Sequence, residues 1–396
     1  ILYILFCKYY FKIIFKVILN SLLKYDKLKR ILPQGIKQGE KMSKLTLGVL
    51  FGGASSEHDI SCISAKSILE NIDKEKYNIV KLGITRQGEW FLFDDDVNML
   101  PNDEWLKSKS LKKAYITPDS KIHGIVTEDG EQIKLDIVFP VLHGKNGEDG
   151  TVQGLLQLAQ IPFVGCDATS SGSCMDKAVT NAVADAFGIE QAKWCAFTEY
   201  EYGKDSRKCL DLAINKLGFP IFVKPANAGS SVGITKAHNE EELIVGIEKA
   251  FKEDKKVVLE EFIEGQEVEV AVLGNEEPIA AEVGQIVAAA EFYDFDAKYN
   301  NPASELHIPA LLSEEKRNEV RQAALKAYKA LSCEGMSRCD FFVTKGDQRV
   351  LLNEINTIPG QTSISMYPKL FEAVGVGYTE LIDRLIDLAI KRGGII

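Results

Sequence analysis

The sequence has no uninterrupted apolar run long enough to cross a membrane, and it has no paired cysteines. Residues 1–23 are largely apolar, but Lys8, Lys12 and Lys16 interrupt them, so no run reaches the roughly 18–20 residues that a membrane span needs. None of the eight cysteines forms a CxxC pair, which argues against a zinc site or a disulfide framework. A reducing cytoplasm fits this cysteine usage. Low-complexity tracts and internal repeats are also missing.

The formal net charge of −10 is unevenly distributed. Residues 1–41 carry nine Lys or Arg and only two Asp or Glu, so the rest of the chain is more acidic than the total suggests. An acidic body argues against general nucleic-acid binding. An anionic substrate would therefore need local positive groups or a metal ion to hold it. With 396 residues, the chain is too long for one core and is expected to form two or three domains.

Residues 1–41 differ from the rest of the chain and allow two interpretations. They could form a basic amphipathic helix at a membrane surface, or they could be translated from sequence upstream of the true start. We favour the second, because Met42 directly precedes a clean first strand and Gly39-Glu40-Lys41 is what a purine-rich ribosome-binding sequence would encode. We therefore expect residues 1–41 to be a non-native or disordered extension, which N-terminal sequencing of the native protein would test.

Two strand–loop–helix corners characterise residues 42–165. In the first, a strand over 45–51 leads through Gly52-Gly53 into a helix whose start carries Glu57; such corners often bind anions or carboxylates. Glu57 either stabilises the helix dipole or holds an ammonium group. In the second, a strand over 135–142 leads into His143 and a glycine-rich loop. Ligands bind at the carboxyl ends of parallel strands, so a functional role is predicted for His143.

Residues 166–260 are predicted to bind an anion. A helix over 170–187 carries Lys177, which could also be an ordinary surface charge. The strand 219–225 brings Lys224 to a loop of small residues that ends at Gly233. Glycine lets backbone N–H groups approach an anion, and the lysine adds a fixed charge. A plain hairpin turn is the alternative. A Walker A motif is absent and a strand follows the loop.

Residues 261–396 contain a hairpin with ligands for a hard metal ion. Glu354 and Asn356 lie two apart on the second strand and share a face, with Asp340 opposite them if the register allows. Arg338 lies on the same face as Asp340. Two carboxylates and an amide oxygen suit Mg²⁺, although an amphipathic hairpin with a wet face would look similar. Pro359-Gly360 ends the second strand and brings the backbone N–H of Gly360 next to the carboxylates. A site that stabilises a developing negative charge needs such a donor.

In this order the stretches resemble the D-alanine–D-alanine ligase family of the ATP-grasp superfamily, over about residues 44–392. The resemblance implies a mixed α/β fold (α+β in the C-terminal part) with three domains: a Rossmann-like N-terminal domain (42–165), a central ATP-grasp domain (166–260) and a C-terminal ATP-grasp domain (261–396). The last would carry the metal site and a lid within 291–310. The motifs that carry the resemblance are 51–61, 143–150, 175–177, 223–233, 293–299, 338–340 and 353–360.

The resemblance also implies the site residues. ATP would be bound by Lys177, Lys224, Ser231, Glu260, Ile263, Glu267 and Lys298. Two Mg²⁺ or Mn²⁺ ions would be held by Asp340, Glu354 and Asn356. The two D-alanine substrates would be bound by Glu57, His143, Arg338, Gly360, Ser365 and Met366. Catalysis would further involve a hydrogen-bonded trio under the lid, formed by Glu57, Ser230 and Tyr299, with Arg338 and the Gly360 N–H forming the oxyanion site.

The activity implied is ATP-dependent formation of D-alanyl-D-alanine through a D-alanyl phosphate, for peptidoglycan precursor synthesis in a bacterial cytoplasm, by a homodimer that binds neither nucleic acid nor membrane. D-Serine as the second substrate is the closest alternative. D-Lactate is disfavoured by Tyr299. A catalytically silent ATP-binding regulator is disfavoured because the metal ligands and Arg338 are present. Phe295-Asp296 and Ile358 depart mildly from the family pattern, and no residue stands out as a general base.

Overall fold

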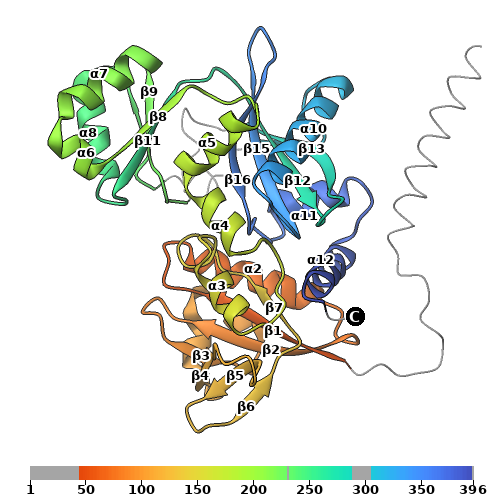
Figure 1. Cartoon of the computed structure of the whole chain (residues 1–396). Helices are drawn as coiled ribbons and strands as arrows, with labels where there is room; N and C mark the ends of the chain where they lie inside the picture. The colour runs from red at the N-terminus through yellow and green to blue at the C-terminus, as the bar shows by residue number, and fades with distance from the viewer. Residues whose placement is uncertain (1–43, 230–231, 288–304, 395–396) are drawn as a thin grey trace, which may run out of the picture. The chain divides into compact units, whose positions relative to one another are not determined.

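The computed structural model of the chain describes residues 44–229, 232–287 and 305–394. Several sequence predictions fall outside the described residues: the extension before Met42, Ser230 and Ser231 of the glycine-rich loop, and the lid with Lys298 and Tyr299. Across the described residues, three separate sheets follow one another along the chain, in the α/β class that the sequence predicted (Figure 1).

The first sheet has seven strands in the order β6-β5-β4-β3-β2-β1-β7. Its centre is parallel: β1 (Leu45–Gly52) pairs with β2 (Tyr77–Ile84) and with β7 (Ile137–Pro140). Parallel strands are covered on both faces, and the last six residues of β1 are all buried. Two helices follow the predicted corners, α2 (His58–Asn71) after β1 and α3 (Thr151–Leu158) after the His143 loop.

The antiparallel edge of this sheet, which begins with β3 (Trp90–Leu92), does not appear in the sequence analysis above. The other strands are β4 (Lys112–Ile116), β5 (Gly124–Thr127) and β6 (Gln132–Lys134). They are short and partly exposed, so their apolar alternation is too weak to read. Two 3₁₀ segments, Val97–Met99 and Pro101–Lys107, connect β3 to β4.

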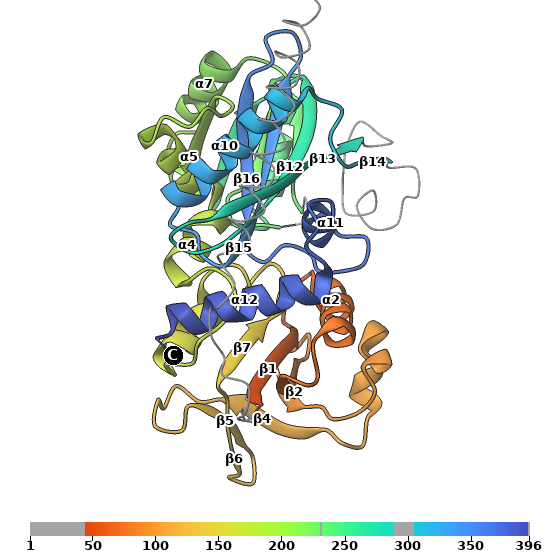
Figure 2. The ribbon, with the colours of Figure 1, turned by 90° about the vertical axis from the view of Figure 1, so that its right-hand side faces the viewer.

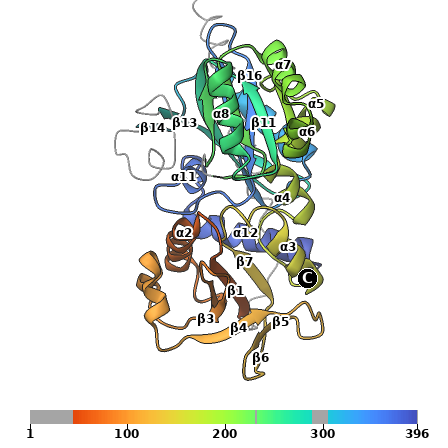
Figure 3. The same ribbon diagram turned by 90° about the vertical axis from the view of Figure 1, so that its left-hand side faces the viewer.

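The second sheet is antiparallel in the order β10-β9-β11-β8. Along β9, Ile221 and Val223 belong to the core under the helices, whereas Phe222 and Lys224 are only half-buried and face the other way. The helices pack on one side of this sheet, as α8 shows in Figure 3. The elements are β8 (Trp194–Thr198), α6 (Glu199–Lys204), α7 (Ser206–Leu217), β9 (Ile221–Pro225), β10 (Thr235–Ala237), α8 (Glu240–Ala250) and β11 (Lys256–Glu261).

The single helix predicted over 170–187 is wrong, because the structure has two helices there. These are α4 (Ala168–Met175) and α5 (Lys177–Ala186), separated by Asp176 in an extended conformation. The Asp176 carboxylate accepts the backbone N–H groups of Ala178 and Val179. An aspartate that can bond the next turn's N–H groups favours a cap over the helix interior. Lys177 is therefore the first residue of α5.

The third sheet is antiparallel in the order β14-β13-β12-β15-β16, with α10 (Glu314–Ala330) against it. Its strands are β12 (Gly265–Leu273), β13 (Ile279–Val287), β14 (Glu305–His307), β15 (Met336–Thr344) and β16 (Val350–Asn356). Strand β14 lies within the range 291–310 in which a lid was expected, and the sequence analysis predicted no strand there. Pairing with the edge of β13 makes these three residues a strand, which their periodicity could not reveal.

The last helix of the chain returns to the first sheet. After α11 (Met366–Glu372), helix α12 (Tyr378–Arg392) packs against α2 and β7 (Figure 2). One apolar core contains Leu47 and Phe139 of the first sheet together with Leu385 of α12. The segment between β16 and α12 is thus held close to the two N-terminal corners. In the described part of the chain, no helix combines the length and the apolar character that a bilayer span requires.

Candidate active site

The hairpin β15–β16 aligns four polar side chains in pairs. Asp340 lies opposite Glu354 and Arg338 opposite Asn356, the register on which the sequence prediction depended. Arg338 donates from Nε and Nη2 to the two Asp340 oxygens at 2.8 and 2.7 Å, and Glu269 Oε2 of β12 lies 3.0 Å from its Nε. Burial alone would lower the pKa of Arg338, but the Asp340 and Glu269 charges outweigh it and raise the pKa well above the usual value. Arg338 is therefore a permanent cation.

The donor set on this face fits a hard divalent cation. Asn356 Nδ2 donates to Asp340 Oδ2 at 3.0 Å, which leaves the amide oxygen of Asn356 as the ligand it can offer. Asp340 is only 7% exposed, and Glu354 adds a second carboxylate from the neighbouring strand. Carboxylate and amide oxygens are ligands of Mg²⁺, which keeps several further positions for water and phosphate.

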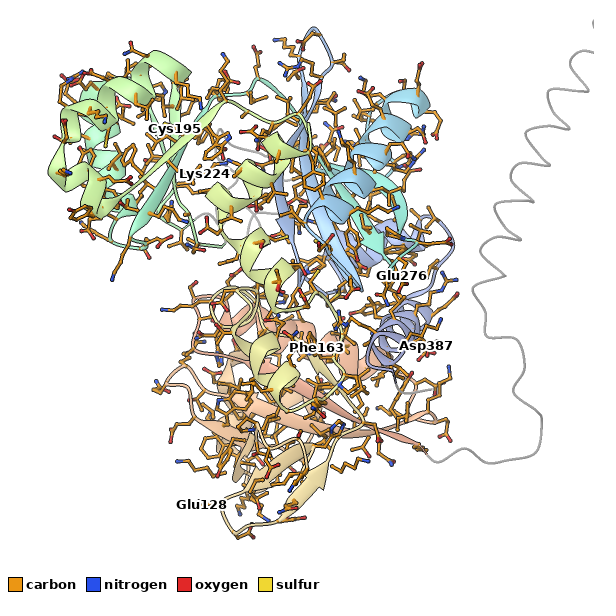
Figure 4. All side chains as sticks on the ribbon, in the orientation of Figure 1. Glu128, Phe163, Cys195, Lys224, Glu276 and Asp387 are labelled. Carbon is orange, nitrogen blue, oxygen red and sulfur yellow. The ribbon has the colours of Figure 1, made fainter. Side chains whose placement is uncertain are left out.

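Lys224 links the second and third sheets. Its Nζ donates to Glu260 Oε2 at 2.6 Å and contacts Asn353 Oδ1 at 3.4 Å. Asn353 is the extra residue where the β15–β16 register shifts, and such a bulge re-aims a side chain. Burial works against the Lys224 charge, but the Glu260 carboxylate outweighs it and raises the Lys224 pKa. Lys224 is labelled in Figure 4.

Lys177 contacts the glycine-rich loop. Its Nζ donates to the backbone oxygen of Ala228 at 2.8 Å, and its backbone N–H donates to Ala226 at 3.0 Å. Asp254 fixes the same loop by accepting both the backbone N–H and the side-chain amide of Asn227 at 2.8 Å. Both predicted phosphate-binding lysines thus lie on or beside this loop.

Glu57 lies where two glycine-rich loops meet. It precedes α2 but makes no side-chain cap to that helix, so a hydrogen-bonded cap does not explain it. A Cβ placed on Gly144 would lie 2.2 Å from Glu57 Oε2, and one on Gly229 would lie 2.6 Å from the same atom. The carboxylate is 7% exposed. Glycine at both positions lets the His143 loop and the small-residue loop approach this carboxylate.

His143 connects the first corner to the loop that follows β16. Its Nδ1 lies 3.0 Å from the backbone oxygen of Ile358, and its Nε2 lies 3.0 Å from Ser64 Oγ. Because a carbonyl only accepts, Nδ1 carries the proton and Nε2 accepts from the serine. Burial lowers the pKa of His143, so the ring is neutral.

Glu148 reaches the same loop from the second corner. Its carboxylate accepts the backbone N–H groups of Gly144 at 2.8 Å and Ile358 at 3.1 Å. Burial, with the nearby Glu57 charge, raises the pKa of Glu148 to about 8.

Gly360, Ser365 and Met366 lie together after β16. A Cβ on Gly360 would lie 2.7 Å from Ser365 Oγ, and that hydroxyl accepts the Thr362 N–H at 3.0 Å. The Met366 side chain is buried, and its Cε would lie 2.2 Å from a Cβ on Gly284. The Met366 thioether therefore packs on β13. The side-chain polar group that lies next to Gly360 is the Ser365 hydroxyl.

Comparison with known proteins identifies the family. Residues 46–166 match the model described as the D-ala D-ala ligase N-terminus, and residues 183–387 match the model of its C-terminus. The chain belongs to the D-alanine–D-alanine ligase family. It is 48% identical over 353 residues to a D-alanine–D-alanine ligase of Clostridium acetobutylicum, covering 88% of this chain and 99% of the relative.

Solved structures agree on the ATP-grasp fold. The VanG D-Ala:D-Ser ligase of Enterococcus faecalis superimposes with a TM-score of 0.81 at 40% identity, covering 88% of this chain and 100% of that one. The D-alanine–D-alanine ligase of Coxiella burnetii gives a TM-score of 0.77 at 36% identity, covering 89% of this chain and 96% of that one. The fold class and the family predicted from the sequence are confirmed.

In this family member the remaining predicted nucleotide residues of the described chain lie on β11, on β12 and between these two strands. Glu260 lies opposite Phe222 on the inner face of the second sheet, and Asn181 Nδ2 approaches Glu260 Oε1 at 3.3 Å. Ile263 is half-buried in the turn before β12, and Glu267 lies near the start of β12 opposite Phe342. The described residues of the predicted nucleotide site thus lie at the start of α5, on β9, and along β11, β12 and the link between them.

The sequence analysis missed four residues of this ligase site: Ser64, Glu148, Phe222 and Glu269. Two of them could have been found from the rule that residues two apart on a strand share a face. Phe222 precedes Lys224 by two positions, and Glu269 follows Glu267 by two. Ser64 carries no local signal, and the 143–150 motif that contains Glu148 does not reveal its partner. Their partners at Gln361 and Ile358 lie 297 and 210 residues away in the chain, so only the fold reveals them.

Proposed function

We propose that this chain joins two D-alanine molecules into D-alanyl-D-alanine and converts one ATP into ADP and phosphate. The observation that carries the proposal is the partly buried Arg338 beside Asp340 and Asn356, on the face that also carries Glu354. This face combines ligands for divalent cations with a permanent cation, and the loop with the Gly360 N–H follows it directly. Such a site suits the transfer of a phosphoryl group to a carboxylate.

ATP would lie between the second and third sheets. Glu260, Ile263 and Glu267 would bind the adenine and ribose. Lys177, Lys224 and Ser231 would bind the phosphates, and Lys298 would reach the transferred phosphoryl group. Asp340, Glu354 and Asn356 would hold two Mg²⁺ or Mn²⁺ ions, which when bound neutralise charge on the phosphates and orient them. In this arrangement Lys224 leaves Glu260 and Asn353 for the nucleotide, as its position between the two sheets allows.

The first D-alanine would place its ammonium group on Glu57, with His143 and Arg338 near its carboxylate. One carboxylate oxygen attacks the γ-phosphorus of ATP, and ADP leaves. The product, D-alanyl phosphate, hydrolyses readily, so water must be excluded. Glu57, Ser230 and Tyr299 would close the lid for this purpose. Ser230 and Tyr299 lie outside the described residues, so this part of the proposal rests on the family resemblance.

The second D-alanine would place its carboxylate at Ser365 and Met366. Because the Met366 side chain is buried, Met366 would contribute through its backbone. The amine attacks the acyl carbon, and Arg338 with the Gly360 N–H stabilises the resulting oxyanion. The C–O bond to phosphate then breaks, so inorganic phosphate leaves with one oxygen from the first D-alanine. The amide bond of the dipeptide remains.

D-Serine is the second candidate for the acceptor, because a D-Ala:D-Ser ligase shares the fold at 40% identity over 88% of this chain. The test measures magnesium-dependent phosphate release with D-alanine alone, with D-alanine plus D-serine and with D-alanine plus D-lactate, and identifies products by mass. We expect release and dipeptide with D-alanine alone. Phosphate release that requires D-serine or D-lactate would mean that this second substrate, and not D-alanine, is the acceptor. ATP binding without any release would instead indicate a silent regulator.

We further propose that the protein is a homodimer and supplies peptidoglycan precursors in a bacterial cytoplasm. The proposal rests on the family to which the chain belongs. Light scattering at micromolar concentration tests the assembly, for which a monomer mass would be the contrary result. Depletion of the protein in its host should deplete dipeptide-containing precursors, and unchanged precursors would contradict the assigned role.

A further inference from the structure

The loop that carries Gly360 is held in place by side chains from the first 150 residues. Ile358, two residues before Gly360, has both backbone polar groups bound. Its oxygen accepts from His143 Nδ1 at 3.0 Å and its N–H donates to Glu148 Oε1 at 3.1 Å. One residue after Gly360, the Gln361 N–H reaches Ser64 Oγ at 3.4 Å. The position of the Gly360 N–H is therefore set from outside its own domain.

Glu148 bridges two parts of the site with a single carboxylate. While Oε1 holds Ile358, Oε2 accepts the Gly144 N–H at 2.8 Å. Gly144 packs closely on the Glu57 carboxylate, since a Cβ there would lie 2.2 Å from Glu57 Oε2. One end of this bridge is thus next to the proposed ammonium site, and the other is next to the proposed oxyanion site.

We propose that Glu148 is a positioning residue for the ligation, setting the separation between the first amino acid on Glu57 and the Gly360 N–H. The inference rests on the proposed function, in which Gly360 donates to the oxyanion. Glu148 acts through Ile358 and has no contact with the reacting atoms in this account. A misplacement of about 1 Å can cost about 100-fold in rate, so a residue that fixes this loop should affect turnover.

A carboxyl group suits this role because each of its two oxygens can accept a hydrogen bond. In Glu148→Gln only one oxygen remains. The shorter Gly144 bond should keep that oxygen, which turns the new NH₂ group toward the Ile358 N–H. Two donors then face each other, and Ile358 is pushed away. In Glu148→Asp both carboxyl oxygens remain, but the side chain is one methylene shorter and cannot span both N–H groups.

The adjacent Asp149 provides a matched control. Its carboxylate also accepts two backbone N–H groups, from Asn146 at 2.8 Å and from Thr151 at 3.0 Å. Both partners are local, because Asn146 lies in the same loop and Thr151 is the first residue of α3. Asp149→Asn therefore removes the same kind of hydrogen bond without touching the loop that carries Gly360.

The experiment compares kcat, the KM for ATP and for D-alanine, and the melting temperature of wild-type protein, E148Q, E148D and D149N. We expect kcat to fall by at least about tenfold in both Glu148 variants, with the KM for ATP within about twofold and melting close to wild type. D149N should stay within about threefold of wild-type kcat.

A wild-type kcat in E148D, or an equal loss in D149N, would overturn the inference. If E148Q does not fold, the kcat of E148D alone tests the inference. If neither folds while D149N does, Glu148 is a structural residue and the inference fails. An inactive wild-type protein is a different result, because it overturns the proposed function and, with it, this inference. The wild-type assay and the comparison of variants therefore separate the two failures.

Discussion

Arg338 and His143 end with different charges, although burial acts on both side chains in the same direction. Burial disfavours charge on both side chains. Arg338 stays charged because Asp340 and Glu269 surround it, whereas the contacts of His143 with Ile358 and Ser64 suit a neutral ring. A permanent cation can stabilise a developing anion, and a neutral ring can fix a loop without adding charge to the site. The surroundings of each residue decide its role.

Arg338→Ala is predicted to lower kcat by about 10²–10³-fold, the usual loss for one oxyanion donor. ATP binding should remain within a few-fold, because the proposed adenine and ribose contacts lie on other strands. Arg338→Lys keeps the charge but loses the paired bonds to Asp340, so an intermediate kcat is expected. Phosphate release and calorimetric ATP binding are the measurements. Wild-type turnover in the alanine variant would remove Arg338 from the mechanism.

His143 is predicted to make the protein less stable in mild acid. Its pKa is lowered from 6.5 by burial. Below that pH the unfolded chain binds a proton that the folded ring does not, so the free energy of unfolding falls as pH decreases, by up to about 1.4 kcal/mol per pH unit. Melting of wild type and His143→Asn at pH 7.5 and 5.5 tests this. The variant should lose less stability between the two values, and equal losses would contradict the prediction.

At the scale of elements, the break between α4 and α5 positions a proposed phosphate ligand. Asp176 caps α5 through the N–H groups of Ala178 and Val179 and pairs with Lys256 on β11. Lys177 follows at once, with its amine on Ala228 of the glycine-rich loop. The cap therefore fixes the start of the helix that delivers Lys177.

Asp176→Ala should destabilise the protein by about 1 kcal/mol, as the loss of a cap usually does, and should also raise the KM for ATP several-fold. Asp205→Ala is the control, because Asp205 caps a different helix, α7, through the Lys208 N–H. The helix that carries Lys177 is not affected. Asp205→Ala should lower the free energy of unfolding by a similar amount and leave the KM for ATP unchanged. Steady-state kinetics and thermal melting distinguish the two. A similar KM in both variants would mean that the cap is only structural.

Sequence reasoning was accurate where patterns are local. The hairpin with Asp340 and Glu354 was predicted from period two and a turn, and its register agrees. It missed one local signal, the Asp176 cap that divides a predicted helix. It also failed where partners are distant, because β14 depends on β13 and Glu148 meets Ile358 only in the folded chain. The family resemblance supplied roles that periodicity could not, such as those of Ser230 and Tyr299, which lie outside the described residues.

At the scale of the whole molecule, α12 closes the fold by returning to the first sheet. Arg392 at its end donates to the backbone oxygens of Gly165 and Phe163 at 2.5 and 2.6 Å and lies 4.6 Å over the Phe163 ring. This contact joins the C-terminus to the end of the N-terminal unit. Because the loop with Gly360 lies between β16 and α12, anchoring α12 also limits the movement of that loop.

Arg392→Ala is predicted to lower the free energy of unfolding by about 1.5–3 kcal/mol, the range for a hydrogen bond to a charged group. Arg384 lies on the same helix but only pairs with Glu380 one turn away, so Arg384→Ala should cost about 0.3–0.5 kcal/mol. Denaturant unfolding of both variants is the measurement. Equal losses would show that the Arg392 contacts do not hold the C-terminus.

The central claim is that a carboxylate is phosphorylated before the amine attacks. The most direct test supplies D-alanine labelled with ¹⁸O in its carboxylate, together with ATP and magnesium, and analyses the released phosphate by mass. The account predicts that each phosphate carries one labelled oxygen and that it appears together with D-alanyl-D-alanine. Phosphate without label would mean that water, not the substrate carboxylate, attacks ATP, and the proposed mechanism would be wrong.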